Sequence, residues 1–243
     1  MNSTIAIVGR GRLGPALARG LRAAGRSVAG PLGRGADGAG ADVVLLCVPD
    51  AEIATAAAAV APRPGLLVGH CSGATALDAL APHEALGLHP LMTVTAEGAG
   101  FAGAGCAVAG STDRALAAAR TLAADLEMRP FAIADADRAA YHAAAAMASN
   151  FLVTLEAAAE RLADTAGVPR DALLPLVRAT VDNWAALGGE RALTGPIARG
   201  DEATVARHRA AVAERAPDLL ALFDAMAQAT RALGAGAGAE AAA

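Results

Sequence analysis

The sequence predicts an α/β fold, in which an N-terminal doubly wound, Rossmann-type sheet is followed by an all-helical C-terminal domain. Short apolar runs alternate with helix-favouring segments from Thr4 to about Ile133. The runs are continuous in the way typical of strands buried on both faces of a parallel sheet. After Asp135 the chain has no glycine or proline as far as Ala166, which favours a long helix.

Seven apolar runs are expected to form the strands of the first domain, residues 1–133. They fall at 5–8, near Val28, and at 43–48, 66–69, 85–88, 106–109 and 131–133. Helices are expected between several of them, at 15–24, 51–60, 74–80 and 113–127. Right-handed crossovers through these helices are what a doubly wound sheet requires.

The second domain, residues 134–233, is expected to be helical. Asp135 is a plausible N-cap for one helix over 135–166, and Gly167 and Pro169 supply its stop. Further helices are expected at 170–187, 201–215 and 218–233, with Pro217 at the first turn of the last one. The low-complexity tail, 234–243, is expected to be disordered.

The first helix of this second domain is too long to lie on the sheet alone. Its alanine stripe at 143–146 permits close contact with another helix. We therefore expect a homodimer formed through the helical domain. An ordinary long core helix in a monomer is the alternative.

Composition restricts the partners and the chemistry. Hydrophobic residues make up 55% of the chain and aromatic residues only 2%, so the core must consist of aliphatic and small side chains. All basic residues are arginine, which excludes a lysine acid, base or Schiff-base amine. The net charge of −4 argues against a nucleic-acid partner.

The sequence shows no clear signal for targeting to a membrane, for disulfide bonds or for metal binding. The N-terminus shows no signal-like segment and no apolar run reaches about 18 residues, so we expect no membrane association and a cytoplasmic protein. Three cysteines without CxxC spacing argue against a disulfide framework and against a metal site.

The segment IAIVGRGRLG, residues 5–14, carries the most specific motif. A strand, a glycine turn and a helix follow one another, which is the context that a GxGxxG dinucleotide site requires. Gly9 permits the tight turn, Gly11 lets the backbone approach a pyrophosphate, and Gly14 lets the helix pack on the strand. Arg12 and Leu13 complete the predicted cofactor-binding loop. The alternative is a strand–helix turn whose glycines serve packing only.

The end of the second strand indicates which dinucleotide binds. NAD sites usually place Asp or Glu about 20 residues past the glycines, on the ribose 2′-hydroxyl. Here no acid precedes Asp37, and Arg34 stands where a 2′-phosphate would lie. This favours NADP over NAD. A surface arginine in an arginine-rich chain is the alternative.

Other candidates follow the carboxyl ends of the middle strands, where ligands bind in open α/β sheets. Val48 and Pro49 are expected along the nicotinamide ribose. Ser72 is expected beside the nicotinamide, and His89 within reach of a substrate. A hydride reductase needs a proton or hydrogen-bond donor for the reacting oxygen or nitrogen, and histidine suits that role.

The long helix carries two more candidates. His142 and Ser149 are seven residues apart and would share a face at 3.6 residues per turn, with Asn150 next to it. We predict His142 as a possible proton donor and Asn150 as a group that orients the substrate. The alternative is that His142 caps a contact and Asn150 satisfies a buried backbone group.

These motifs together resemble a known family. VGRGRLG, HCSG, GLHPLMT, YHAAAAMASNFLVTL and LTGPIARGD are similar to segments of Rossmann-like proteins with a C-terminal DUF2520 domain. That family is similar to 6-phosphogluconate dehydrogenase, ketopantoate reductase and pyrroline-5-carboxylate reductase. The resemblance implies an NADP-binding N-terminal domain, a helical dimerisation domain and a cleft between them, but no substrate.

One departure from the related enzymes matters. The hydroxyacid dehydrogenases and ketopantoate reductase use a lysine four residues before an asparagine, whereas Ala146 precedes Asn150 here. Their proton donor cannot be carried over, although an iminium substrate already carries its own proton.

The sequence therefore predicts an NADP-dependent oxidoreductase that reduces a small carbonyl or imine acid. A non-catalytic NADP-binding regulatory or scaffold dimer is the alternative. Methyl transfer from S-adenosylmethionine fits the glycine loop less well.

Overall fold

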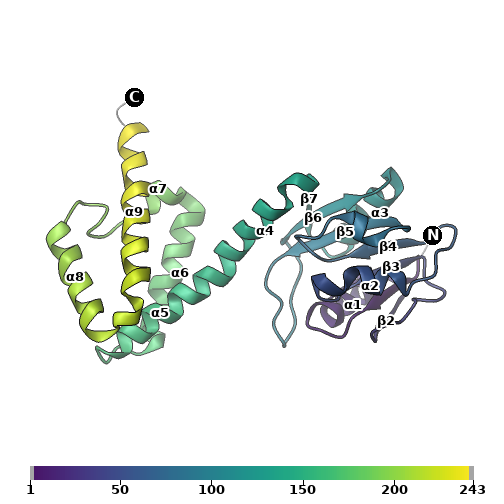
Figure 1. The fold of residues 1–243 in the computed structure, drawn as a ribbon, viewed down its shortest axis with the longest axis horizontal. Helices are drawn as coiled ribbons and strands as arrows, with labels where there is room; N and C mark the ends of the chain where they lie inside the picture. The colour runs from purple at the N-terminus through teal and green to yellow at the C-terminus, as the bar shows by residue number, and fades with distance from the viewer. Residues whose placement is uncertain (1–2, 241–243) are drawn as a thin grey trace. The chain divides into compact units, whose positions relative to one another are not determined.

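Seven strands form a single sheet in the order β2-β1-β3-β4-β5-β6-β7 (Figure 1). The structure is a computed structural model that describes residues 3–240. The strands are β1 Ile5–Val8, β2 Val28–Leu32, β3 Val43–Leu46, β4 Leu67–His70, β5 Glu84–Leu91, β6 Gly105–Gly110 and β7 Arg129–Ala132. All seven predicted strands are present, and the predicted α/β fold class is confirmed.

The sheet is mixed, which the sequence did not indicate. Strands β1 to β5 pair in parallel, but β6 runs antiparallel to β5, with His89 opposite Ala107. The reason lies in the connection. Parallel neighbours need a crossover, usually through a helix, whereas residues 92–104 between β5 and β6 contain no helix.

Helices cover both faces of the sheet. One buried cluster combines side chains of α1 (Leu13–Ala23) and α3 (Asp113–Asp125) with the strands. The other is formed with α2 (Ile53–Ala58) on the opposite face. Because the helices are rich in alanine and glycine, they approach the sheet closely. The expected helix at 74–80 is only a 3-10 turn, Leu77–Leu80.

The long helix predicted over 135–166 is not regular throughout. A 3-10 turn, Asp135–Asp137, precedes α4 (Arg138–Ala146), and a π-helical turn, Met147–Phe151, separates α4 from α5 (Leu152–Asp164). Asp135 pairs with Arg138 at 2.6 Å, and the residue before α4 is Asp137. At about 3.6 residues per turn, His142 and Ser149 would lie on one face of the helix. The π turn has more residues per turn, so this spacing does not apply across it.

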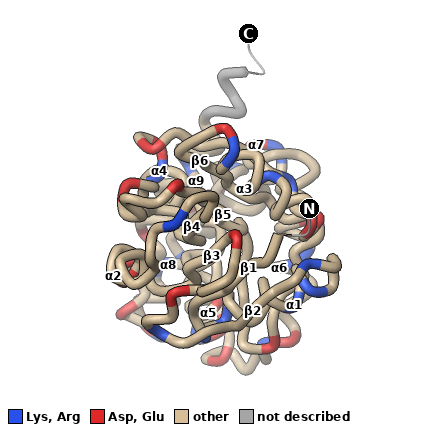
Figure 2. The backbone as a smooth tube through the Cα atoms, turned by 90° about the vertical axis from the view of Figure 1, so that its right-hand side faces the viewer, with Lys and Arg blue, Asp and Glu red and all other residues tan. Residues whose placement is uncertain are grey.

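The chain divides into two compact units that meet between Ser149 and Asn150. The sequence places the division at 133/134, where the sheet ends. In the structure α4 belongs to the first unit, because its Tyr141 packs against the rings of His89 and Phe131. Arginines and acidic residues are interspersed on the face of the molecule that Figure 2 shows.

The second unit is helical. After α5 it contains α6 Arg170–Leu187, α7 Gly189–Ala192, α8 Glu202–Arg215 and α9 Leu220–Glu240. Asp201 caps α8 by accepting a hydrogen bond from the backbone N–H of Thr204, and Pro217 opens a 3-10 turn before α9. The last helix continues past Leu233, and residues 241–243 lie outside the described part of the chain.

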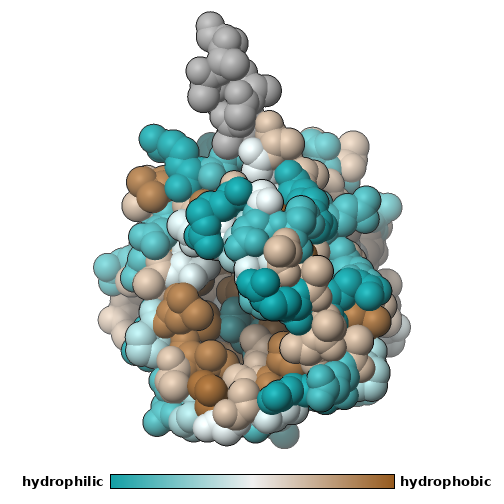
Figure 3. Space-filling view, turned by 90° about the vertical axis from the view of Figure 1, so that its left-hand side faces the viewer, coloured by the Kyte–Doolittle hydropathy of each residue, from teal (hydrophilic) through white to brown (hydrophobic). Residues whose placement is uncertain are grey.

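Large apolar side chains are exposed in this unit, whereas the sheet unit buries most of its own. Phe151 is 62% exposed, Leu176 66% and Trp184 60%. Figure 3 shows apolar patches among polar ones on the side of the molecule at the left of Figure 1. Within residues 3–240, no helix has both the length and the hydrophobicity that crossing a membrane requires.

We predict that Gly14→Ala destabilises the sheet unit. A Cβ atom at Gly14 would lie 2.1 Å from the carbonyl oxygen of Gly9, which real contacts do not allow. Overpacking costs about 1–3 kcal/mol, which exceeds the helix propensity that alanine adds, about 1 kcal/mol. Urea denaturation measures the change.

Gly11→Ala is the matched control for this prediction. A Cβ atom at Gly11 would meet nothing within 4 Å, so we expect an unchanged unfolding midpoint. Equal midpoints for the two variants would contradict the packing argument.

Candidate functional site

The glycine turn between β1 and α1 forms one wall of the site. Gly9 has a φ of +126°, and a Cβ atom there would lie 2.1 Å from the carbonyl oxygen of Cys47. Gly14 packs against Gly9 in the same way, while the space beside Gly11 is open. The three glycines therefore differ as the motif predicts: two are fixed by packing, and the third leaves its backbone accessible.

The N-terminus of α1 can receive an anion. No side chain caps this helix, and its first turn contains no acidic residue. The first backbone N–H groups lie at the positive end of the helix dipole, and no capping side chain accepts a hydrogen bond from them. A phosphate group at this position would satisfy them.

A cavity of about 410 Å³ lies beside this helix terminus, within the first unit. Its walls come from the glycine turn and from the segments that follow β3, β4 and β5. The lining residues are Gly11, Arg12, Leu13, Cys47, Val48, Pro49, Asp50, Cys71, Ser72, His89, Pro90, Met92 and Val94. The volume is in the range of small-molecule sites. The candidates expected at the carboxyl edge of the sheet are thus brought together.

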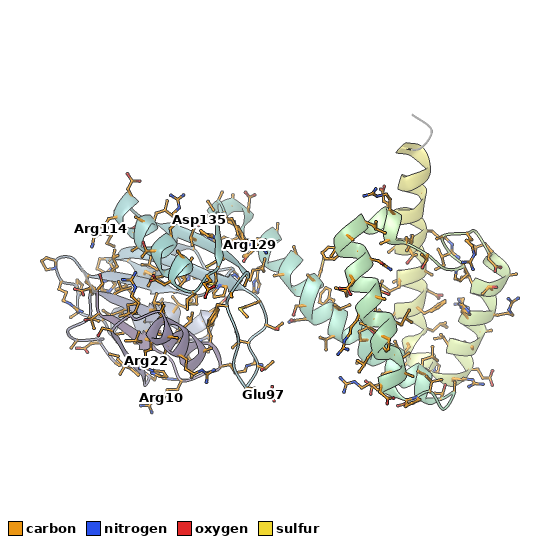
Figure 4. All side chains as sticks on the ribbon, turned by 180° about the vertical axis from the view of Figure 1, so that it is seen from behind. Arg10, Arg22, Glu97, Arg114, Arg129 and Asp135 are labelled. Atoms are coloured by element: carbon orange, nitrogen blue, oxygen red, sulfur yellow. The ribbon has the colours of Figure 1, made fainter. Side chains whose placement is uncertain are left out.

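Arg34 stands two residues after the end of β2. It is 82% exposed and pairs with Glu52 at 3.2 Å. Arg10 lies beside the same segment, because a Cβ atom at Gly33 would be 3.6 Å from the Arg10 guanidinium carbon. In Figure 4 the Arg10 side chain projects outward from the sheet unit. Two arginines therefore flank the end of β2, where only Arg34 was predicted to contact the cofactor.

Ser72 lines the cavity, but its hydroxyl is already hydrogen-bonded within the protein. It is within hydrogen-bond distance of Asp50 Oδ2, at 2.8 Å, and accepts from the backbone N–H groups of Ala74 and Thr75. The backbone N–H of Ser72 donates to Nδ1 of the buried His70 at 3.2 Å. These bonds tie the loop after β4 to the turn after β3, so Ser72 shapes the cavity wall.

His89 meets Tyr141 at the site. Nδ1 of His89 is 2.6 Å from the hydroxyl oxygen of Tyr141, and the two rings pack edge to face with centroids 5.5 Å apart. Burial lowers the pKa of His89 to about 4, and repulsion from His142 contributes. Burial also raises the pKa of Tyr141 to about 12. Both side chains are therefore neutral near pH 7.

His142 and Asn150, the two candidates from the long helix, do not line the cavity. The ring of His142 lies 6.2 Å from that of His89, and both rings border Gly73. His142 is exposed and is not among the cavity-lining residues. Asn150 is exposed, belongs to the second unit, and does not line the cavity. Its role as an orienting residue stays a prediction.

Tyr141, Asp50 and the cysteine pair were missed by the sequence analysis. Tyr141 directly precedes His142 in a motif that was recognised, but residue spacing cannot show which ring reaches β5. The sulfur atoms of Cys47 and Cys71 lie 3.8 Å apart. Within residues 3–240 no group of three or more His, Cys, Asp or Glu could hold a metal ion.

Solved structures resemble this one over nearly the whole chain. A provisionally assigned NADP oxidoreductase from Bacteroides fragilis matches with a TM-score of 0.83 and 21% identity, covering 95% of this chain and 98% of that chain. A Thermotoga maritima protein matches with a TM-score of 0.75 and 23% identity, covering 96% and 98%. A reductive aminase from Aspergillus terreus, in complex with NADPH, matches with a TM-score of 0.67 and 16% identity, covering 95% and 96%. At these identities the likeness shows the fold.

No protein of curated function matches the chain. Two family models do. One, a Rossmann-like domain, matches residues 31–95, and the other, a domain of unknown function (DUF2520), matches residues 104–230. Because the second match spans more than half of the chain, this protein belongs to the DUF2520 family.

Proposed function

We propose that this protein is an NADP-dependent oxidoreductase that reduces a small carbonyl or imine acid by hydride transfer. The observation that carries the proposal is the cavity that joins the open side of Gly11, the uncapped helix α1 and His89. Such a cavity can hold a pyrophosphate at one end and a reacting group at the other. NADPH, when bound, supplies the hydride.

Two arginines support NADPH over NADH. Arg34 and Arg10 flank the segment after β2, where dinucleotide sites recognise the ribose 2′ position. No acidic residue lies between the glycine turn and Asp37, and Asp37 accepts a hydrogen bond from the backbone N–H of Ala39 in its own loop. Two solved structures of similar fold, the Aspergillus terreus reductive aminase and a Plasmodium falciparum pyrroline carboxylate reductase of TM-score 0.61, contain NADPH and NADP, respectively.

The chain's own residues have distinct roles in this proposal. Val48 and Pro49 shape the wall along the nicotinamide ribose, and Ser72 holds the loop beside it. His89 offers a hydrogen bond to the reacting atom of the substrate. His142 lies 6.2 Å from His89, ring to ring, and lowers its pKa by repulsion. Asn150 is proposed to orient the substrate.

A dinucleotide-binding protein without turnover is the second candidate. The observation that favours it is the absence of lysine, which removes the proton donor of related dehydrogenases. Turnover separates the two functions. Oxidation of NADPH with a panel of short keto and imine acids supports the reductase, whereas tight NADPH binding without any oxidation supports the regulatory protein.

We predict that NADPH binds more tightly than NADH and that Arg34→Ala removes the difference. Losing one charge-assisted contact to the 2′-phosphate weakens NADPH binding by about tenfold or more and leaves NADH binding unchanged. Glu52→Gln frees Arg34 of its carboxylate partner, so we expect tighter NADPH binding. Fluorescence titration measures both affinities.

Arg120→Ala is the matched control, because this arginine is exposed on α3 and its loss changes the net charge equally. If Arg120→Ala weakens NADPH as much as Arg34→Ala, a general charge effect explains the result and the 2′-phosphate assignment is wrong.

We also propose that the helical unit forms a homodimer. Leu176 and Trp184 are exposed on α6 and eight residues apart, which places them about 80° apart around the helix, within the width of one apolar stripe. Exposed apolar surface of this kind marks protein–protein contacts. Closed two-fold dimers are the commonest assemblies of soluble proteins.

The dimer is tested by light scattering after size-exclusion chromatography. We expect a dimer for the wild-type chain and a monomer for the double variant Leu176→Glu, Trp184→Glu. Ala210→Glu places a charge on the exposed face of α8 and should leave the dimer intact. A wild-type monomer at micromolar concentration contradicts the proposal.

A further inference from the structure

The relative acidity of the two side chains gives the hydrogen bond between Tyr141 and His89 a direction. The Tyr141 hydroxyl oxygen is 2.6 Å from Nδ1 of His89. A neutral phenol is a stronger acid than a neutral imidazole N–H, and the unprotonated imidazole nitrogen is the stronger base, so the phenol is the donor. The phenol proton therefore points to Nδ1 of His89. Because a neutral imidazole carries one proton, that proton is then on Nε2.

Nε2 of His89 is the ring nitrogen left for a ligand. It makes no hydrogen bond to any of residues 3–240. Within residues 3–240, the buried side-chain nitrogen that has no hydrogen-bond partner is Nε2 of His70. Nε2 of His89 also has no partner among these residues but is not buried, so a ligand can reach it. His89 itself lines the cavity. A donor without an acceptor thus stands in the wall of the proposed active site.

We propose that Tyr141 is a positioning residue that holds His89 as the Nε2–H tautomer, and that this donor selects a carbonyl substrate over a protonated imine. The inference rests on the proposed reductase function. A carbonyl oxygen accepts a hydrogen bond from Nε2–H. The nitrogen of a protonated imine has no free lone pair and can only donate a hydrogen bond. It would therefore place its N–H against the N–H of His89, which is unfavourable.

The same pair completes the proton balance of the reduction. Hydride forms a C–H bond at the carbonyl carbon and leaves the electron pair of the C=O π bond on oxygen. That alkoxide takes the Nε2 proton of His89, while Nδ1 takes the hydroxyl proton of Tyr141. The immediate products are the alcohol, His89 as its neutral Nδ1–H tautomer and a tyrosinate. Nδ1 then returns its proton to the tyrosinate while water protonates Nε2 and leaves as hydroxide, which restores the Nε2–H donor. Because an alkoxide is a much stronger base than a phenolate, the relay runs toward the alcohol.

The surroundings of His89 keep this donor neutral over the working pH range. Burial lowers its pKa to about 4, with repulsion from His142, Arg138 and His70 in the same direction and attraction to Asp50 opposing it. A histidine that acts as an imidazolium acid would lose activity above about pH 6.5. Here activity from the neutral donor stays constant from about pH 5 to pH 8.

The first test needs no turnover. In the full chain with ¹⁵N-labelled histidine, we expect the His89 resonances of an Nε2–H tautomer and a titration midpoint near pH 4. Tyr141→Phe removes the hydroxyl and is expected to give a mixture of tautomers. Phe131→Leu disturbs the ring that packs on Tyr141 at 6.0 Å but keeps the hydroxyl, so His89 should stay Nε2–H. An Nδ1–H tautomer overturns the role of Tyr141, and a midpoint near pH 6.5 overturns the proposal that His89 acts as a neutral donor.

The second test compares a short 2-oxo acid with a cyclic imine acid of the same carbon number. We expect a higher kcat/KM for the oxo acid, a profile that is flat from pH 5 to pH 8, and a loss of about 100-fold in kcat for Tyr141→Phe. His89→Gln, which keeps an N–H donor, should retain more activity than His89→Ala. Preference for the imine acid overturns the substrate class, whereas no oxidation of NADPH with either acid contradicts the proposed reductase and leaves the tautomer result standing.

Discussion

The structure of the sheet unit depends on a close approach of backbone to backbone at the glycine turn. Gly9 lies against the carbonyl of Cys47, and Gly14 lies against the carbonyl of Gly9, in both cases at distances that a Cβ atom would not permit. These contacts join β1, β3 and helix α1 at one point. The helix N-terminus is thereby fixed beside the end of β3, which is where the cavity opens.

The remaining walls follow from this placement. Once α1 and β3 are joined, the parallel register carries β4 and β5 along the same edge, and their carboxyl ends bring Ser72 and His89 to the cavity. Ser72 is hydrogen-bonded to Asp50 and to backbone N–H groups of its own loop. These bonds join the wall that follows β3 to the wall that follows β4. Preorganisation of this kind is what a hydride-transfer site requires from its protein.

The sequence predicted the parts of the molecule that depend on local chemistry. Continuous apolar runs identify buried strands because each residue of such a strand faces a helix layer. The packing of Gly14 against Gly9 depends on residues only a few positions apart, whereas the cofactor contact expected at Gly11 stays a prediction. The direction of β6 and the π turn at Met147–Phe151 depend on contacts distant in sequence, and no glycine or proline marks that turn. The same holds for Tyr141, which reaches His89 across 52 residues of chain.

The missing lysine is informative about the chemistry. A lysine donor changes its charge when it gives up its proton, and a buried site must accommodate both states. His89 and Tyr141 form a different kind of donor, because both are neutral before reaction and the negative charge appears only with the alkoxide. Such a pair needs no buried counter-ion in the resting state. The residues that line the cavity are mostly uncharged, with Arg12 and Asp50 as the exceptions, and such a lining suits a donor that is polar but uncharged.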